Sequence, residues 1–384
     1  MKNDKINIFK SKIEEKIKNN DFVGYNPYDL LASPLFEKIS NRKLLILLTQ
    51  FFKILPINFR KCFKIKKMVS PKAFGLMLSA FMIKGKNENE IPAKLYKWLI
   101  DNKSKKFEGY SIGFPFSIVI SHYKSEANHP SLIITLFVMY SFIEYYLKSG
   151  NDEILQTILS FEKVIENDLP YQETDEYLYY SYNFSKLNEV YNATAKVGKF
   201  YSLFYQIYER DEFKNKIKKI LNYLISKQND DGTWYYSENV KYVDGFHTAF
   251  ILEAIWEMKK LVTNNEIEEM FEKGMNNYKT NFIKTNGQPL YFHPKHKPND
   301  VRKYFTETDI RDCAMGIILY TKFNMKEEAE KILNWTLKNM FNEKKLYFYH
   351  FKEKFWTNNI EYVRPQAWMY YAITLFNNKW RINE

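Results

Sequence analysis

Two kinds of apolar segment alternate along this chain. One kind is amphipathic, with a single apolar stripe opposite a charged face, as in residues 211–227. The other kind is apolar on nearly all sides, as in residues 131–146 and 249–258. A helix of the first kind belongs on the outside of a helical protein, and a helix of the second kind belongs inside it.

Each amphipathic segment precedes an apolar one, in six successive units. The predicted outer helices cover 41–55, 90–103, 152–166, 211–227, 265–282 and 325–341. The predicted inner helices begin near Pro71, Pro130, Asn188, Asp244, Asp309 and Arg364, at intervals of 59, 58, 56, 65 and 55 residues. A repeat that cannot bury its own apolar face stacks on its neighbours. The pattern therefore predicts an all-α (α/α)6 toroid of six helical hairpins, with an inner and an outer ring of helices.

A single domain accounts for most of the length. A prior of about 150 residues per domain would divide the chain into two or three, but no linker interrupts the repeat. Residues 1–20 carry alternating charge without an apolar face, so we expect an N-terminal helical arm exposed to solvent. Residues 21–384 are then expected to form one toroid domain.

Charge and cysteine content narrow the setting of the protein. The net charge is +12, but lysine far outnumbers arginine, whereas phosphate-binding proteins favour arginine. We therefore expect no nucleic-acid partner. Two unrelated cysteines and the lack of a signal peptide favour a cytoplasmic location. Residues 132–147 are shorter than the roughly 20 residues that cross a bilayer and include Glu144, so we interpret them as a buried inner helix.

Aromatic loops precede five of the predicted inner helices. They cover 109–116, 177–183, 232–236, 290–293 and 346–350. Because the inner helices of such a ring run parallel, these loops meet on one face, where aromatic rings can stack on sugars. The expected substrate-binding residues of this cleft are Tyr110, Tyr182, Asp231, Trp234, Tyr235 and Tyr291. With aromatic residues at 18 % of the chain, packing of the loops explains any single ring equally well.

Polar side chains open several of the same helices. The catalytic candidates are Asp244, His247, Glu307 and Asp309, and further substrate-binding candidates are Asn192, Arg311, Arg364 and Gln366. Asp244 and Asp309 are also expected to cap their helices. A lone histidine on an apolar helix, such as His247, is commonly a core residue.

The reaction stays open at this point. A glycoside hydrolase needs two carboxylates on either side of the scissile bond, and the sequence does not choose a pair from Asp231, Asp244, Glu307, Asp309 and Asp312. An epimerase or lyase needs a base, for which His247 or Tyr182 is the candidate, and a cation such as Arg311 or Arg364 to bind an anion.

We expect no cofactor and no metal. No glycine-rich phosphate loop is present. His293 and His296 have a metal-like spacing, but the intervening and following prolines and lysines disfavour a bound cation.

A set of short motifs resembles a known family. The motifs are Tyr-Asn-Pro-Tyr-Asp at 25–29, Ser-Pro at 33–34, Asn-Phe-Arg at 58–60, Ser-Pro-Lys-Ala-Phe-Gly at 70–75, Asp-Gly-Thr-Trp at 231–234, Asp-Gly-Phe-His-Thr at 244–248 and Arg-Pro-Gln-Ala-Trp at 364–368. In order and spacing this set is similar to VpsJ-like polysaccharide biosynthesis proteins, and it extends over nearly the whole chain.

The resemblance implies a toroid of the six-hairpin glycosidase and terpenoid-cyclase type that acts on a glycan or glycolipid on the cytoplasmic side of the membrane. It supplies no catalytic pair. The chain departs from the pattern at Glu108, where a tryptophan is expected, at Phe116, where another is expected, and at Met315, where a glutamine is expected. These departures leave the identity of the bound sugar open.

Three hypotheses of function follow. The first is a carbohydrate-active enzyme of surface-glycan biosynthesis, with hydrolase, lyase or epimerase activity. The second is a non-catalytic glycan-binding or scaffold partner of a glycosyltransferase, with peripheral membrane contact through the basic segment 60–67. A solvated turn is the alternative interpretation of that segment. The third is a toroid that binds a prenyl lipid, which would require a deep apolar cavity with few polar groups.

Overall fold

The computed structural model describes residues 2–85, 90–119, 124–299, 302–357 and 360–380. Its helices are α1 (Lys2–Lys18), η1 (Asp29–Ala32), α2 (Pro34–Glu37), α3 (Arg42–Ile54), α4 (Pro71–Lys84), α5 (Glu90–Asp101), α6 (Leu132–Ser149), α7 (Asp152–Asn167), α8 (Tyr191–Tyr205), α9 (Asp211–Ser226), α10 (Gly245–Met258), α11 (Asn265–Phe282), α12 (Arg302–Phe305), α13 (Ile310–Lys322), α14 (Lys326–Asn339) and α15 (Val363–Trp380).

Short antiparallel strand pairs lie in the loops between these helices. The strands are β1 (Ile118–Val119), β2 (Lys124–Ser125), β3 (Tyr171–Glu173), β4 (Leu178–Tyr180), β5 (Thr306–Asp309), β6 (Phe341–Asn342), β7 (Tyr347–Phe348) and β8 (Phe351–Glu353). The pairs are β1 with β2, β3 with β4, β5 with β8 and β6 with β7. Two of the predicted aromatic loops are therefore built partly from strands.

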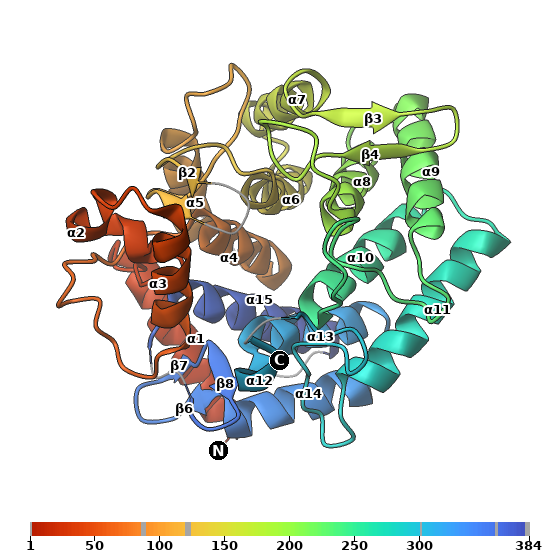
Figure 1. Cartoon of the computed structure of the whole chain (residues 1–384). Helices are drawn as coiled ribbons and strands as arrows, with labels where there is room; N and C mark the ends of the chain where they lie inside the picture. The colour runs from red at the N-terminus through yellow and green to blue at the C-terminus, as the bar shows by residue number, and fades with distance from the viewer. Residues whose placement is uncertain (1, 86–89, 120–123, 300–301, 358–359, 381–384) are drawn as a thin grey trace.

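The predicted ring closes. Helices α4, α6, α8, α10, α13 and α15 each contact the next, and α15 returns to α4 (Figure 1). Helices α5, α7, α9, α11 and α14 pack outside them (Figure 1). The protein is an (α/α)6 toroid, as the alternation of helix types predicts.

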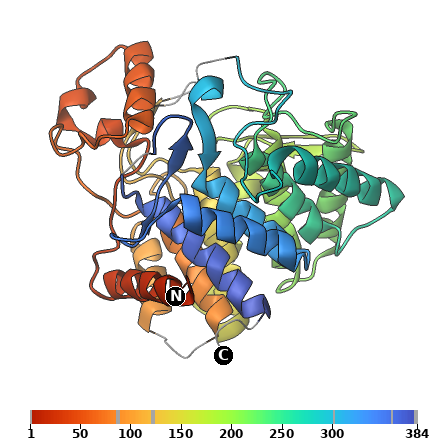
Figure 2. The ribbon, with the colours of Figure 1, turned by 90° about the horizontal axis from the view of Figure 1, so that it is seen from below.

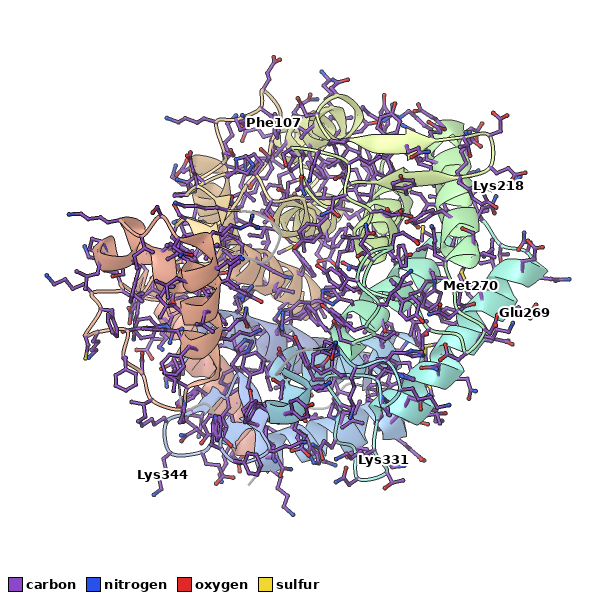
Figure 3. The ribbon with its side chains drawn as sticks, viewed as in Figure 1. Phe107, Lys218, Glu269, Met270, Lys331 and Lys344 are labelled. Atoms are coloured by element: carbon purple, nitrogen blue, oxygen red, sulfur yellow. The ribbon has the colours of Figure 1, made fainter. Side chains whose placement is uncertain are left out.

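Burial explains which helix takes which ring. Most residues of the inner helix α10 are buried, including its polar Thr248 and Glu253. The outer helix α9 buries one stripe, with Phe213, Ile217 and Leu221, while Lys218 is exposed. Figure 3 shows side chains filling the space inside the ring, whereas the labelled Lys218 lies at its rim.

Helix α6 is long and apolar enough to cross a membrane by length and composition. It contacts α4 and α8 on either side, and 61 % of its apolar window is buried within the protein. The sequence-based interpretation of this segment as an inner helix is confirmed.

The N-terminal helix corrects the prediction of a solvated arm. Helix α1 buries Ile6, Phe9, Ile13 and Ile17, which are spaced by three or four residues and so share one face. The ring of Phe9 packs edge-on against Phe348 at 5.1 Å. Charged residues between these four positions conceal the apolar stripe in the sequence. Helix α1 takes the outer position in the first hairpin.

Helix α3 therefore does not serve as the outer helix that the sequence predicted at 41–55. It lies with α2 and η1 in a separate apolar cluster that contains Leu31, Phe36, Leu45 and Phe52. This cluster stands to one side of the ring (Figures 1 and 2). The segment between α1 and α4 is thus an excursion from the ring and not half of a hairpin.

Candidate active site

The first turns of the inner helices meet on one face of the ring. The ammonium group of Lys72, at the start of α4, lies over the rings of Phe246 at the start of α10 and Trp368 in the first turns of α15, at 5.6 and 5.4 Å. The guanidinium of Arg311, at the start of α13, lies 4.5 Å from the ring of Phe246. Side chains from four inner helices therefore line one cleft, as the parallel arrangement predicts.

A histidine–aspartate pair opens helix α10. Asp244 caps the helix by accepting a hydrogen bond from the backbone N–H of His247 at 2.8 Å. Its other oxygen, Oδ2, lies 2.7 Å from Nδ1 of His247. Because a carboxylate oxygen accepts, Nδ1 carries the hydrogen and Nε2 is left with a lone pair. Asp244 is buried, whereas the side chain of His247 is 28 % exposed, so the imidazole is the accessible member of the pair.

A buried ion pair opens helix α13. Asp309 caps that helix through the N–H of Arg311 at 2.9 Å. Both of its oxygens also accept from the Arg311 guanidinium, with Nε–Oδ2 at 2.9 Å and Nη2–Oδ2 at 2.5 Å. Burial would raise the pKa of Asp309, but the charge of Arg311 outweighs it and lowers this pKa to about 2. Asp309 is thus held as an anion that orients Arg311.

His350 completes this part of the cleft from the loop before α15. Its Nδ1 lies 3.7 Å from Oδ1 of Asp309, and its ring is 1 % exposed. Burial holds the pKa of His350 well below its ordinary value. His350 is therefore a neutral imidazole that packs against the ion pair.

Arg364, at the start of α15, is a buried cation to which the described residues supply no ion pair. Its side chain is 7 % exposed, and its Nε and Nη2 make no hydrogen bond within the described part of the chain. Its guanidinium lies 5.6 Å from the ring of Tyr28 and 6.0 Å from that of Phe114. Burial, and next the charge of Arg311, lower the pKa of Arg364 to about 10, so it is still a cation at neutral pH.

The excursion between α1 and α4 covers this end of the cleft. Tyr28 reaches Arg364, and Lys53 of α3 lies 5.5 Å from the ring of Tyr28 and 5.1 Å from that of Phe351. The charges of Lys53, Arg311 and Arg364 lower the pKa of Tyr28 to about 8. A buried ion pair between Asp29 and Arg60, with Nε–Oδ1 at 2.9 Å, anchors the excursion at the next residue.

Two lysines lie among aromatic rings at the floor. The ammonium groups of Lys72 and Lys196 are each 4.0 Å from the ring centre of Phe137, and Lys196 is 3.3 Å from that of Phe250. Burial, together with a neighbouring lysine charge in each case, holds the pKa of both well below the ordinary value. Beneath them an internal cavity is lined by Phe137 and Trp368 and by the charged Lys199 and Glu253.

Aromatic rings form one wall of the cleft. Tyr236 stacks on Tyr242 at 5.4 Å with an interplanar angle of 19°, and it meets His247 edge-on at 4.9 Å. Tyr291 packs against Phe292 at 4.4 Å. Burial holds the pKa of Tyr291 well above its ordinary value, and the charges of Arg311, Asp244 and Asp309 also act on it. Of the predicted aromatic residues, Tyr291 therefore lies among the charged groups of the cleft.

Trp234 and Asp231 lie elsewhere, which corrects their assignment to the cleft. Trp234 is 2 % exposed, donates from Nε1 to the carbonyl of Leu224 at 2.9 Å, and fits against Gly274 of the outer helix α11. Asp231 accepts from Thr233 in a tight turn and lies 2.8 Å from Nε2 of His296. The Asp-Gly-Thr-Trp motif is thus a structural turn between α9 and α10, whose tryptophan packs against the outer helices α9 and α11.

Other predicted contacts are occupied by the protein itself. Tyr110 is buried and donates to the carbonyl of Leu99, and Gln366 bonds both backbone groups of Phe348. Glu307 pairs with Lys284 and Lys352. These three residues hold loops and do not point free polar groups into the cleft.

The remaining candidates lie near the cleft rim or inside α8. Asn192 is buried in the first turn of α8, and its amide Nδ2 makes no hydrogen bond within the described part of the chain. Tyr182 is half-buried. It lies near Tyr236, whose pKa is held well above its ordinary value first by burial and next by Tyr182. Tyr235 is half-buried and meets the ring of His296 edge-on at 5.6 Å, which places it beside the Asp231 turn.

Sequence reasoning missed several contributors to the cleft, among them Tyr28, Lys53, Lys72 and His350. Tyr28 and Lys72 lie within two of the family-like motifs, and His350 lies in a predicted aromatic loop, so their motifs were a usable signal. Lys53 has no such signal, because it lies on a helix that the repeat placed in the outer ring. Its position depends on the excursion, which only the fold reveals.

Metal ligands do not gather anywhere in the described part of the chain, where no group of three His, Cys, Asp or Glu side chains could hold an ion. His293 and His296 stack on each other at 4.8 Å. His293 has a pKa lowered to about 4, chiefly by burial.

Comparison with known proteins establishes the fold class. No protein-family model matches the chain, and no curated protein matches its sequence. Among solved structures, cellobiose 2-epimerase from Bacillus thermoamylovorans has a TM-score of 0.63 at 14 % identity, covering 83 % of this chain and 90 % of that one. A GH76 α-mannanase from Bacteroides thetaiotaomicron gives 0.59 at 11 %, covering 81 % and 86 %. A D-mannose isomerase gives 0.55 at 10 %, covering 79 % and 85 %. The fold is that of the six-hairpin glycosidase-like toroids.

Proposed function

We propose that this protein is a carbohydrate-processing enzyme that removes a proton from a sugar carbon and returns it, as an epimerase or isomerase does. The observation that carries the proposal is the Asp244–His247 pair, together with Arg311, which lies over the ring of Phe246, the residue before His247. Asp244 fixes Nδ1 of His247, so Nε2 takes a proton from a carbon next to a carbonyl. Arg311 supplies positive charge where the resulting enolate oxygen develops.

The state of the carboxylates argues against a hydrolase. Hydrolysis requires two carboxyl groups that are free to act on the glycosidic bond. Asp309 is committed to Arg311, and Glu307 to two lysines. Asp312 is 1 % exposed, and its pKa lies well above the ordinary value because of burial and the nearby charges of Asp309 and Asp244. Within the cleft, Asp244 is coupled to the accessible imidazole of His247, and that group is a base.

Arg364 indicates that the sugar carries an anionic group. Two of the buried guanidinium nitrogens of Arg364, Nε and Nη2, make no hydrogen bond within the described residues, which is costly, and a carboxylate or phosphate would satisfy them through two parallel hydrogen bonds. Tyr28, with its pKa near 8, lies beside Arg364 and is a second group that can exchange a proton at the reacting carbon.

The structural neighbours include a cellobiose 2-epimerase, a further sugar epimerase and a D-mannose isomerase, alongside GH76 glycoside hydrolases. They support a carbohydrate-processing enzyme. The motif resemblance to VpsJ-like proteins supports a role in surface-polysaccharide biosynthesis, in the cytoplasm, with a glycan or glycolipid as substrate and a glycosyltransferase as partner.

A prenyl-lipid site fits less well. The internal cavity beneath the cleft is lined by Glu144, Lys199 and Glu253, and charged groups disfavour an isoprenoid chain.

The test is hydrogen exchange at carbon. The protein is incubated in D₂O with neutral sugars, uronic acids and sugar phosphates, and NMR follows loss of each C–H signal. We expect exchange next to the carbonyl of an acidic sugar, and His247→Gln to lower its rate by about 10²- to 10⁴-fold. Asp244→Asn keeps the helix cap, so it should lower the rate with little change in thermal stability.

Glu307→Gln is the matched control. It also removes one carboxylate, from β5, but leaves Asp244 and His247 unchanged. Cleavage of a glycosidic bond without deuterium at carbon would replace the proposal with hydrolysis. Exchange that persists in His247→Gln would reject the assigned base. Binding of sugars without either reaction would favour the glycan-binding alternative.

A further inference from the structure

The excursion between α1 and α4 carries an unusual concentration of exposed apolar side chains. Six of the fourteen exposed large hydrophobic residues in the described part of the chain lie within it: Leu35, Leu44, Leu47, Phe51, Ile57 and Phe59. Leu47 and Ile57 are 66 % and 61 % exposed. Elsewhere such residues lie singly, as is normal for a soluble surface, so this cluster requires its own explanation.

Helix α3 has two apolar faces. Leu45, Thr49 and Phe52 are buried and face the small cluster under the excursion. Leu44, Leu47 and Phe51 are exposed, and their spacing of three and seven residues puts them on one separate stripe. Packing within the protein accounts for the first face and leaves the second in solvent.

The same segment is strongly basic. From Lys38 to Lys67 the sequence holds nine lysine and arginine residues and no aspartate or glutamate. Lys53 and Arg60 are buried, and Arg60 is paired with Asp29, which corrects the view of 60–67 as a uniform surface patch. The exposed cations are Lys38, Arg42, Lys43, Lys61, Lys64, Lys66 and Lys67.

We propose that the outward face of this excursion docks on the surface of an anionic membrane. Apolar side chains flanked by lysines are the composition of interfacial helices, which insert their apolar face at the headgroup boundary and attract acidic lipids. The complete lack of acidic residues over thirty positions fits an anionic partner by charge. A bilayer also accommodates the six apolar side chains, which a purely polyanionic partner such as nucleic acid does not.

This docking is tested separately from the proposed reaction. It rests on the outward side chains of the excursion, whereas the reaction rests on α10, α13 and α15 and on the inward-facing Tyr28. The excursion stands beside the ring in both views (Figures 1 and 2), so a membrane can reach it without deforming the toroid.

Vesicle sedimentation of the full chain tests the proposal. Vesicles of phosphatidylcholine are compared with vesicles that also contain phosphatidylglycerol. We expect binding to the second kind only, weakened by salt. Lys64→Gln with Lys66→Gln should lower the partition coefficient about 25-fold, because each cation near an acidic bilayer contributes about fivefold. Leu47→Ser with Phe51→Ser should lower it by at least about tenfold through lost apolar insertion.

The matched control is Lys218→Gln with Lys331→Gln. Both lysines are exposed on the outer ring, on α9 and α14, and their pair should change binding by no more than about twofold. Equal losses from the two lysine pairs would show diffuse charge attraction and overturn the docking surface, as would failure of the wild-type protein to bind acidic vesicles. A dimer in solution that Leu47→Ser with Phe51→Ser dissociates, without vesicle binding, would assign this face to a second copy of the chain.

Discussion

The ion pair between Asp309 and Arg311 gives a quantitative test of how the cleft is held. The carboxylate is fully buried and bonds the guanidinium through both oxygens. The change Asp309→Asn keeps an oxygen for the helix cap but removes the charge. It leaves Arg311 buried without its anion, and removal of one partner of such a pair costs about 3–5 kcal/mol in the free energy of unfolding.

The pH dependence of that loss checks the cause. The pKa of Asp309 is about 2 in the folded protein and about 3.9 in an unfolded chain. Because folding lowers this pKa, the stabilisation is present above about pH 4 and is lost as the pH falls toward about 2. The difference of roughly two units corresponds to about 2.6 kcal/mol. The gap in stability between wild type and Asp309→Asn should therefore narrow by about that amount in acid.

Urea unfolding followed by circular dichroism, repeated across this pH range, measures the gap. Glu307→Gln is the control, because Glu307 pairs with two lysines at the partly exposed rim and its loss should cost under about 1 kcal/mol. If the gap for Asp309→Asn stays constant with pH, or is no larger than that of the control, the ion pair does not hold the cleft as argued.

Three further changes test separate parts of the structure. Burial raises the pKa of Glu353 to about 7. Because folding raises this pKa, the stability of the wild-type protein falls as the pH rises from about 4 to about 7. In urea unfolding across that window, Glu353→Gln should gain up to about 3 kcal/mol in the free energy of unfolding relative to wild type. Trp234→Ala should lose about 3–5 kcal/mol in the free energy of unfolding. Calorimetry at a temperature where the variant is folded should show unchanged affinity for the sugar that the wild-type protein binds. A lower affinity would show that Trp234 contacts the sugar in the cleft. Phe9→Ala should lose a similar amount in thermal or urea unfolding, whereas a solvated arm would lose less than about 0.5 kcal/mol.

The repeat of helix types predicted the ring because it reflects burial directly. Residues 265–282 were expected to form an outer helix, and α11 has those bounds. Asp244 and Asp309 were expected to cap inner helices, and both accept the predicted backbone hydrogen bond. These features depend on residues near one another in the chain, so local pattern and capping chemistry are sufficient to find them.

Features set by distant contacts escaped the sequence analysis. Helices α1 and α3 both precede the first inner helix. Because the charged residues of α1 conceal its apolar stripe, the sequence pattern assigns the outer position to α3 instead of α1. Trp234 is of a residue type that stacks on sugars. It packs against Gly274 instead, where the glycine has no side chain to occupy the space. That Nε and Nη2 of Arg364 make no hydrogen bond within the described part of the chain likewise becomes visible only when the surrounding groups are in place.

The excursion joins the two proposals in one element. Phe51 and Lys53 lie two residues apart on α3 and so point to different sides of the helix: Phe51 is exposed, and Lys53 is buried beside Tyr28 and Phe351. Tyr28 in turn contacts Arg364, and the charge of Lys53 is the largest contributor to its lowered pKa. A membrane that bound the outward stripe of α3 would therefore also position the residues that cover the cleft. The proposed acidic-sugar site would then lie next to the bilayer from which a lipid-linked substrate would arrive.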